Sequence, residues 1–134
     1  MADGLQWIGL ARRAGLLALG EENTRAALRG GKAVLVVVAR DTSPGALKRA
    51  EGYVYLPEVP LLVAPYDKAQ ISERTGKPGC SMAAFLDIGL AAGFAEALRE
   101  EFGTIYAETA EALNARRDRV RSRKGNTGKR RKMV

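Results

Sequence analysis

The sequence predicts an α/β/α sandwich, because segments typical of helices and of strands alternate along almost the whole chain. Short apolar runs at residues 16–19, 34–39, 60–64 and 81–86 have the length and composition of strands. The run from Val34 to Ala39 is continuously apolar and mostly valine, which is typical of a central strand buried on both faces. Alternating elements need crossover connections, which place helices on both faces of a sheet.

The first third of the chain predicts two helices on either side of a short strand. Apolar residues at helical spacing within residues 5–11 indicate an amphipathic helix, which Gly15 closes. Residues 16–19 follow as an edge strand that ends at Gly20. The next helix begins near Glu21, where acidic side chains suit the helix dipole, and it stops at Gly30.

After the central strand, Ser43 and Pro44 indicate a new helix, with the serine as N-cap and the proline in the first turn. This helix is predicted to run to about Glu51. Residues 53–58 fit either an extended loop or a strand, and the pattern leaves the two open. A strand over residues 60–64 comes next.

The last third predicts a short helix, a strand and a long terminal helix. Asp67 or Ser72 caps the short helix, which ends near Gly76. The long helix follows residues 87–89 and is interrupted at Gly103. Its apolar positions, which we expect to face the core, are Phe94, Ala97, Leu98, Ile105 and Leu113.

Positive charge is concentrated at the C-terminus. Residues 116–134 hold ten of the twenty-two Lys and Arg residues and one acid, so this stretch carries +9, whereas residues 1–115 carry −2. Such a run cannot bury its charges or form an apolar face, and we expect it to bind a polyanion, most commonly nucleic acid. The alternative is a tail that only improves solubility. The boundaries predicted are an α/β/α domain over residues 1–103, a helical extension over 104–115, and a disordered or helical basic tail over 116–134.

The composition argues against catalysis. The chain has no histidine and one cysteine, Cys80, which excludes Ser-His-Asp and Cys-His systems as well as zinc knuckles and fingers. Its paired carboxylates, at residues 21–22 and 100–101, fit helix-end charges. We therefore expect no enzyme, no cofactor and no metal. A single cysteine, no secretory signal and no apolar run of eighteen residues predict a cytoplasmic protein without membrane contact.

Three loops are candidates for a binding site, because ligands of layered α/β folds bind where strand ends meet helix starts. These loops span Gly20–Arg25, Ala39–Pro44 and Lys77–Ser81. Two of them lead into helix N-termini, whose backbone N–H groups suit phosphate or base acceptors. The alternative is that all three are plain connections, which is the default for loops.

Five segments in order resemble the L7Ae kink-turn RNA-binding ribosomal protein family, and most closely its small bacterial YlxQ-type branch. They are LARRAG at 10–15, GEE at 20–22, GGKAVLVVVARD at 30–41, VPLLV at 59–63 and TGK at 75–77. The resemblance covers about residues 5–100. It implies an α/β/α sandwich around a mixed four-stranded sheet, and binding of kinked or bulged RNA through the same three loops.

The family's first loop carries a glycine, any residue, asparagine, glutamate pattern with a lysine three residues further on. The resemblance places Gly20 on the glycine, Glu22 on the asparagine, Asn23 on the glutamate and Ala26 on the lysine. Only the glycine is retained. Glu22 and Asn23 can form similar hydrogen bonds in swapped order, since amide and carboxylate both pair with base edges. Arg25 stands next to the missing lysine and can replace its phosphate contact.

The sequence thus predicts an RNA-binding protein whose partners are ribosomal RNA or a kink-turn, and also ribosomal or assembly proteins. Arg12 and Arg13 on the first helix are weaker candidates. The small residues near Gly79 suit a flipped nucleotide. The predicted RNA-binding residues are Gly20, Glu22, Asn23, Arg25, Arg29, Lys32, Arg40, Lys77 and Gly79.

The competing hypothesis is a protein-interaction adaptor on the same fold, with the tail as a general polyanion anchor. An enzyme that acts on small nucleotides is a remote third alternative. A gathering of the basic side chains in the fold would favour RNA, and their scatter would favour the adaptor.

Overall fold

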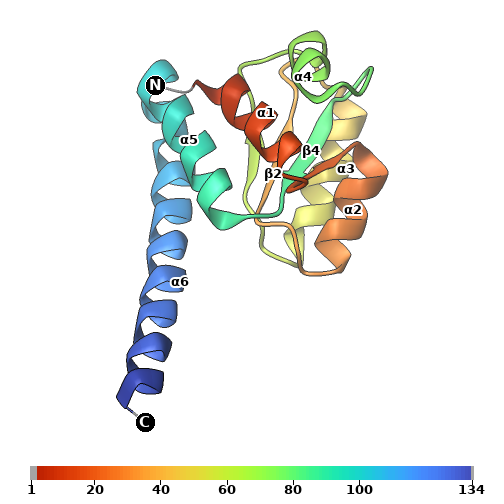
Figure 1. Ribbon diagram of the computed structural model, residues 1–134. Coiled ribbons are helices and arrows are strands. Elements are labelled where there is room, and N and C mark those ends of the chain that lie inside the picture. Colours follow the sequence, from red (N-terminus) through yellow and green to blue (C-terminus); the bar gives the residue numbers. More distant parts are fainter. Residues whose placement is uncertain (1–2, 134) are drawn as a thin grey trace.

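The computed structural model describes the backbone of residues 3–133 and the side chains of residues 3–123. Helices and strands alternate from the N-terminus to the last strand, as the sequence predicts, and two α-helices joined by a short 3-10 helix follow (Figure 1). The elements are α1 (Gly4–Arg13), β1 (Leu17–Leu19), α2 (Glu21–Arg29), β2 (Leu35–Val38), α3 (Pro44–Tyr55), β3 (Leu61–Val63), α4 (Lys68–Thr75), β4 (Met82–Phe85), α5 (Ile88–Phe102), the 3-10 helix η1 (Thr104–Tyr106) and α6 (Ala107–Met133).

The sheet is mixed and has four strands in the order β1-β4-β2-β3. β2 and β3 are parallel, whereas β4 is antiparallel to both β1 and β2. Every residue of the two central strands is buried, in keeping with the valine-rich run that predicts a buried strand. The three-residue strands β1 and β3 form the edges. The predicted fold class is therefore confirmed.

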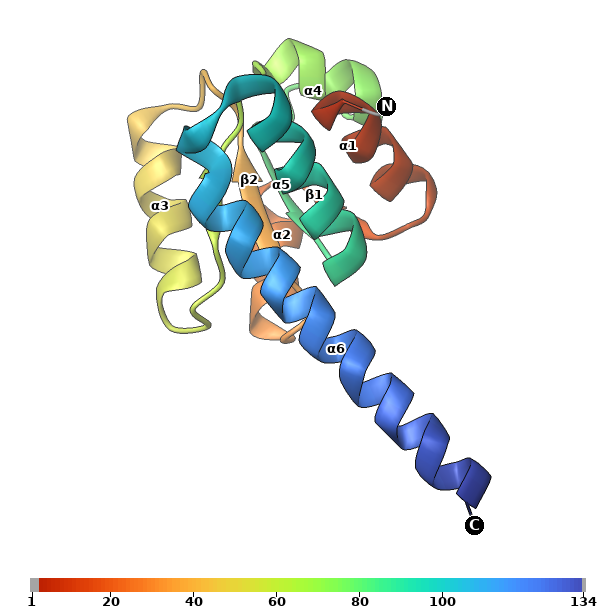
Figure 2. The same ribbon diagram turned by 90° about the vertical axis from the view of Figure 1, so that its left-hand side faces the viewer.

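Helices cover both faces of this sheet and enclose two apolar cores. On one face, α1, α4, α5 and the start of α6 pack through residues such as Ile8 and Phe94 against Phe85 of β4. On the other face, Leu28 of α2 and Ala50 of α3 pack against the alternate residues of β2 and β4. Figure 2 shows α3 and α5 on opposite sides of β2, which is the three-layer arrangement.

Side-chain caps begin several of the helices. Ser43 accepts a hydrogen bond from the N–H of Ala46 with Pro44 in the first turn, as predicted. Asp67, and not Ser72, caps α4, and Gln70 completes its capping box. The hydroxyl of Ser72 instead accepts the N–H of Cys80, which ties α4 to the loop before β4.

Two details of the sequence prediction are wrong. α3 continues to Tyr55 and not to Glu51, so the ambiguous stretch is helix followed by a turn. Contacts with distant residues stabilise the last turn of α3, because the hydroxyl of Tyr53 donates to Glu21 of α2 and Val54 packs on the core beneath α2 and α3. Ile105 is 79% exposed and not in the core. The predicted break at Gly103 changes the helical phase, so that Tyr106 is buried in its place and donates its hydroxyl to the carbonyl of Val63.

α6 begins against α5 and then leaves the body of the domain. Ala110 and Leu113 of α6 are buried in the core, and polar contacts join Glu96 and Arg99 of α5 to Glu111 and Asn114 of α6. Figures 1 and 2 show the rest of α6 continuing as a straight helix past the end of the sheet. Among the residues that the structure describes, no helix is both long enough and apolar enough to span a membrane.

Candidate functional site

The three predicted loops meet at one end of the sheet. β1 and β2 end where the antiparallel strand β4 begins, so their loops adjoin the loop that leads into β4. Gly20 donates its N–H to the carbonyl of Met82 at 2.8 Å, and Ala39 donates to Ser81 at 2.8 Å. The hydroxyl of Thr42 donates to the same Ser81 carbonyl at 3.1 Å. The loops are therefore joined by direct hydrogen bonds and form one continuous surface.

Gly20 has a backbone conformation that suits glycine alone. Its φ of 90° and ψ of 164° lie in a region that side-chain-bearing residues essentially never occupy. A Cβ at this position would also stand 2.9 Å from the Nζ atom of Lys77. The glycine in the family pattern therefore serves two purposes here, because it makes the turn into α2 and leaves room for the Lys77 ammonium group above it.

Lys77 and Asn23 converge on the last carbonyl of β1. The Nδ2 atom of Asn23 donates to the oxygen of Leu19 at 2.9 Å, and the Nζ atom of Lys77 reaches the same oxygen at 3.4 Å. Glu22, the neighbour of Asn23, is exposed. Glu22 and Asn23 therefore have different surroundings: Asn23 contacts the backbone beside Lys77, and Glu22 faces solvent.

An open groove runs along the edge strand β1 next to these residues. Its polar lining comes from Arg12, Asn23 and Lys77, and its apolar lining from β1 itself with Ala27 and Leu86. The Nε atom of Arg12 donates to the carbonyl of Thr75 at 3.0 Å, which holds the guanidinium group at the wall of the groove. Two cations from α1 and from the loop before β4 therefore line one groove beside Gly20.

Arg12 was a weak candidate in the sequence, and its partner explains why. It is 63 residues away from Thr75, and only the packing of α1 against α4 brings the two together. No local pattern around Arg12 separates it from Arg13, which does not line the groove. A sequence signal was therefore absent, and the structure adds Arg12 to the site.

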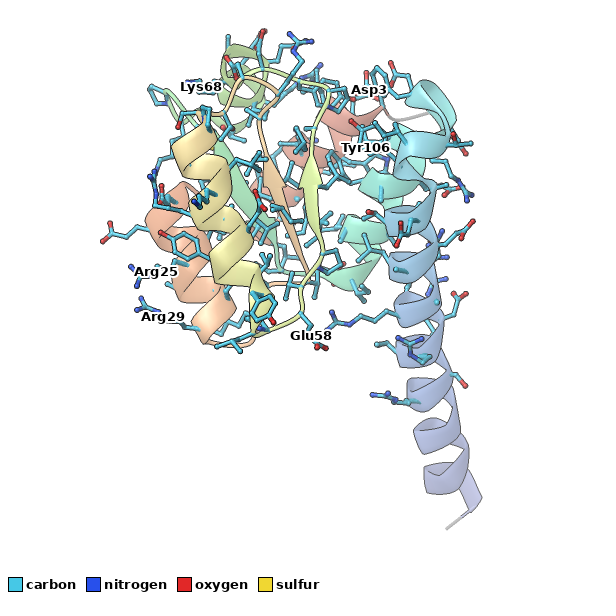
Figure 3. All side chains as sticks on the ribbon, turned by 180° about the vertical axis from the view of Figure 1, so that it is seen from behind. Asp3, Arg25, Arg29, Glu58, Lys68 and Tyr106 are labelled. Atoms are coloured by element: carbon cyan, nitrogen blue, oxygen red, sulfur yellow. The ribbon has the colours of Figure 1, made fainter. Side chains whose placement is uncertain are left out.

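The remaining predicted cations lie elsewhere. Arg25 stands over the ring of Tyr53 of α3, 5.3 Å from its centroid, and Arg29 follows one turn later; Figure 3 shows both projecting from the same side of α2. Lys32 is exposed in the turn after α2, at the end of that helix away from the loops. These three residues form a separate basic edge along α2.

The second and third loops contribute one cation and one glycine. Arg40 is 62% exposed, donates to the carbonyl of Pro65 at 3.3 Å and pairs with Asp67 at 3.6 Å. Gly79 has a φ of 67° and open space around it. Cys80 is buried, and burial raises the pKa of its thiol, so it is a packing residue of this loop. Within residues 3–123, no cluster of three acidic or cysteine side chains has the arrangement of a metal site.

Glu21 has a structural role at the start of α2. Its carboxylate accepts two hydrogen bonds from Arg49, at 2.8 and 3.1 Å, and one from the hydroxyl of Tyr53 at 2.7 Å. These bonds lower the pKa of Glu21 from its ordinary value of 4.5 to about 2, with the Arg49 bond as the largest cause. Because Arg49 and Tyr53 belong to α3, the contact fixes the first turn of α2 relative to its neighbour.

The lowered pKa of Glu21 predicts acid-dependent stability. The ion pair contributes fully above pH 4.5 and is lost as the pH falls toward 2, because the carboxylate is protonated in that window. We expect Glu21→Gln to lower the free energy of unfolding at pH 7 by less than about 1 kcal/mol, since solvent screens this exposed pair. Urea unfolding at pH 7, 4.5 and 2.5 measures it: the difference in unfolding free energy between parent and variant should be smallest at the lowest pH. A gap that is constant with pH would contradict the assignment.

The geometry defines a class of protein: a small α/β/α domain that gathers three hydrogen-bonded loops and a cation-lined groove at one end of a mixed sheet. A sequence profile of the Ribosomal protein L7Ae/L30e/S12e/Gadd45 family matches residues 2–95, and the chain belongs to this family. The resemblance inferred from the five sequence segments is thereby confirmed.

Individual relatives agree with this assignment. The chain is 42% identical over 71 residues to a protein named RNA-binding protein YlxQ from Enterococcus faecium, an alignment that covers 53% of this chain and 68% of that protein. A solved structure described as a protein with unknown function from Bacillus halodurans matches with a TM-score of 0.67 at 24% identity. That match covers 73% of this chain and 98% of the other, and it shows a shared fold.

Proposed function

We propose that the protein binds structured RNA, such as a kinked segment of ribosomal RNA or a kink-turn, and that it does so without catalysis. The observation that carries this proposal is the groove beside Gly20, where Arg12 and Lys77 present two cations next to three joined loops. Membership of the family and the name of the YlxQ relative support the choice of RNA over other polyanions. The protein would act in the cytoplasm.

The groove cations would bind phosphates, and the start of α2 would contact bases. Arg12 and Lys77 are donors that suit phosphate oxygens. Glu22 is exposed and can accept hydrogen bonds from base edges. The amide of Asn23 uses one N–H on Leu19, while an amide also has a second N–H and a carbonyl oxygen to offer. Because Gly20 has no side chain, the RNA backbone could approach it closely.

The outer residues would extend the contact. Arg25, Arg29 and Lys32 would follow a strand along α2, and Arg40 would hold the loop after β2 near the RNA. Open space at Gly79 suits a base turned out of its stack. In this proposal residues 1–103 form the RNA-binding domain, residues 104–115 a helical extension, and residues 116–134 a basic tail that adds sequence-independent affinity.

A protein partner is the second candidate, and two observations favour it. The basic residues divide between the groove and the α2 edge, and so do not form one patch. In addition, Tyr55 and Leu56 at the end of α3 are 78% and 87% exposed, which is unusual for neighbouring large apolar side chains. A ribosomal or assembly protein could cover them while the loops contact RNA.

The test compares the affinity of the full chain for a kink-turn RNA with its affinity for a regular duplex of the same composition and length, across a range of salt concentrations. We expect the kink-turn to bind about tenfold or more tightly at every salt concentration, because shape recognition by the loops persists when phosphate contacts are screened. Equal affinities with equal salt dependence would contradict the proposal and would favour the protein partner.

A further inference from the structure

The basic residues of α6 follow helical turns that are packed against the body of the domain. Its first turns are held on α5 by the buried residues Ala110 and Leu113 and by the pair of Arg99 with Glu111. The helix then continues without a break to Met133. Twenty-seven residues at the helical rise span about 40 Å. The basic segment therefore extends from the body in a fixed direction, because its base is packed.

The basic part of α6 is far from the loop site. Figure 1 shows α4 and the neighbouring loops at the top of the molecule, whereas the C-terminal end of α6 lies below the body. Figure 2, turned by 90° about the vertical axis, shows the same vertical separation. In Figure 3, Lys68 at the start of α4 marks the loop end, and α6 again projects from the opposite end. The two regions thus face different parts of any bound molecule.

The exposed arginines of this helix lie on more than one of its sides. Arg116 and Arg119 are exposed about one turn apart on the same side, and at 100° per residue the exposed Arg121 lies on the opposite side. The sequence adds five further Lys and Arg residues between 124 and 132. Val120 is the only large apolar residue from 114 to 132. The helix consequently lacks the apolar stripe that a membrane surface or a coiled-coil partner requires.

A straight helix with basic side chains along its length fits a row of phosphates. Double-helical RNA presents such rows along the outside of its strands, where a protein can contact phosphates and 2′-hydroxyls without entering the deep and narrow major groove. We infer that residues 116–132 of α6 form a helical arm that binds a second segment of the same RNA, a double-helical one away from the loop contact. This inference rests on the proposed RNA-binding function and adds a separate site to it.

Two full-length variants test the arm. Val120→Pro breaks the helix within the arm without changing its charge, because proline removes a backbone hydrogen bond and clashes with the preceding turn. Val120→Ala is the matched control. The triple variant Arg116→Gln, Arg119→Gln, Arg121→Gln keeps the helix and removes three charges. All lie beyond the buried residues Ala110 and Leu113, but Arg121 lines a hollow with Glu96 and Glu100 of α5, so the melting temperature of each variant is measured beside that of the parent and the binding is compared where all are folded.

The RNA probes are a kink-turn with short stems and the same kink-turn with one stem extended by about 40 Å, the length of the whole of α6. We expect the extended RNA to bind the parent chain about tenfold more tightly, and both the proline and the triple variant to lose that gain while binding the short RNA unchanged. Val120→Ala should keep it. A proline variant that retains the full gain would overturn the inference, because a disordered tail would then suffice.

Other outcomes separate the arm from the loops. If the variants weaken both RNAs equally, the basic segment acts at the loop site and the second site is disproved. If kinked and regular RNAs bind alike but a long duplex still depends on the arm, the proposed shape recognition fails and the arm remains supported. Binding of the parent chain to anionic vesicles, lost in the triple variant and with no binding to either RNA, would overturn both in favour of a membrane.

Discussion

Replacing Arg12 and Lys77 together with glutamate should lower the affinity for a kink-turn RNA about 100-fold, because two charge-assisted phosphate contacts become repulsive. These two residues line the same groove although they are far apart in the sequence. The dependence of log affinity on log salt should also fall by about 2 units, one for each phosphate released. Fluorescence anisotropy with a labelled RNA over a salt series measures both quantities in one experiment.

A control with the same change in charge distinguishes a local effect from a general one. Lys48 of α3 and Arg74 of α4 are exposed and do not line the groove. Their double replacement by glutamate should lower the affinity by less than about threefold, since charges outside the contact act only through a screened field. If both double variants lose the same affinity, the groove is not the binding site. Lys77→Glu alone answers the same question should the loss of the Arg12–Thr75 hydrogen bond weaken the fold.

Sequence patterns predicted those parts of the fold that depend on neighbouring residues. The valine run identified β2, Ser43 and Pro44 marked the start of α3, and Gly103 marked the end of α5. Each of these residues determines the backbone conformation only of the few residues next to it in the sequence. The patterns failed at residues 52–55, because that part of α3 depends on a bond to Glu21 across the domain.

The site divides in the same way. Family resemblance and loop position both indicated the Gly20 turn and Lys77, and the structure brings the two together. The sequence ranks Arg12 low because only the packing of α1 against α4 places it in the groove. The sequence predicts that Glu21 is a partner of the helix dipole, but its main partners, Arg49 and Tyr53, are 28 and 32 residues away. Contacts of this range leave no trace in a local pattern.

Gly20→Ala should be the most damaging single substitution in the loop site. Its backbone lies in a region essentially closed to residues with a Cβ, which predicts a loss of about 1–3 kcal/mol in the free energy of unfolding. Gly52→Ala is the matched control, since Gly52 lies within α3 with nothing near its missing Cβ. That replacement should stabilise the protein by about 0.5–1 kcal/mol, as alanine favours helix. Urea titration of both variants measures the contrast, and equal stabilities would contradict the assigned backbone conformation.

The same substitution should weaken RNA binding even in the folded population. An alanine Cβ would stand 2.9 Å from the Nζ atom of Lys77, so the ammonium group must leave its place above the turn. Measured in conditions where more than about 95% of the variant is folded, the affinity should still fall about tenfold, the effect of losing one well-placed cation. Combining Gly20→Ala with Lys77→Ala should then cost little more than either change alone, because both remove the same contact. Fully additive losses would mean that Gly20 acts on the RNA independently of Lys77.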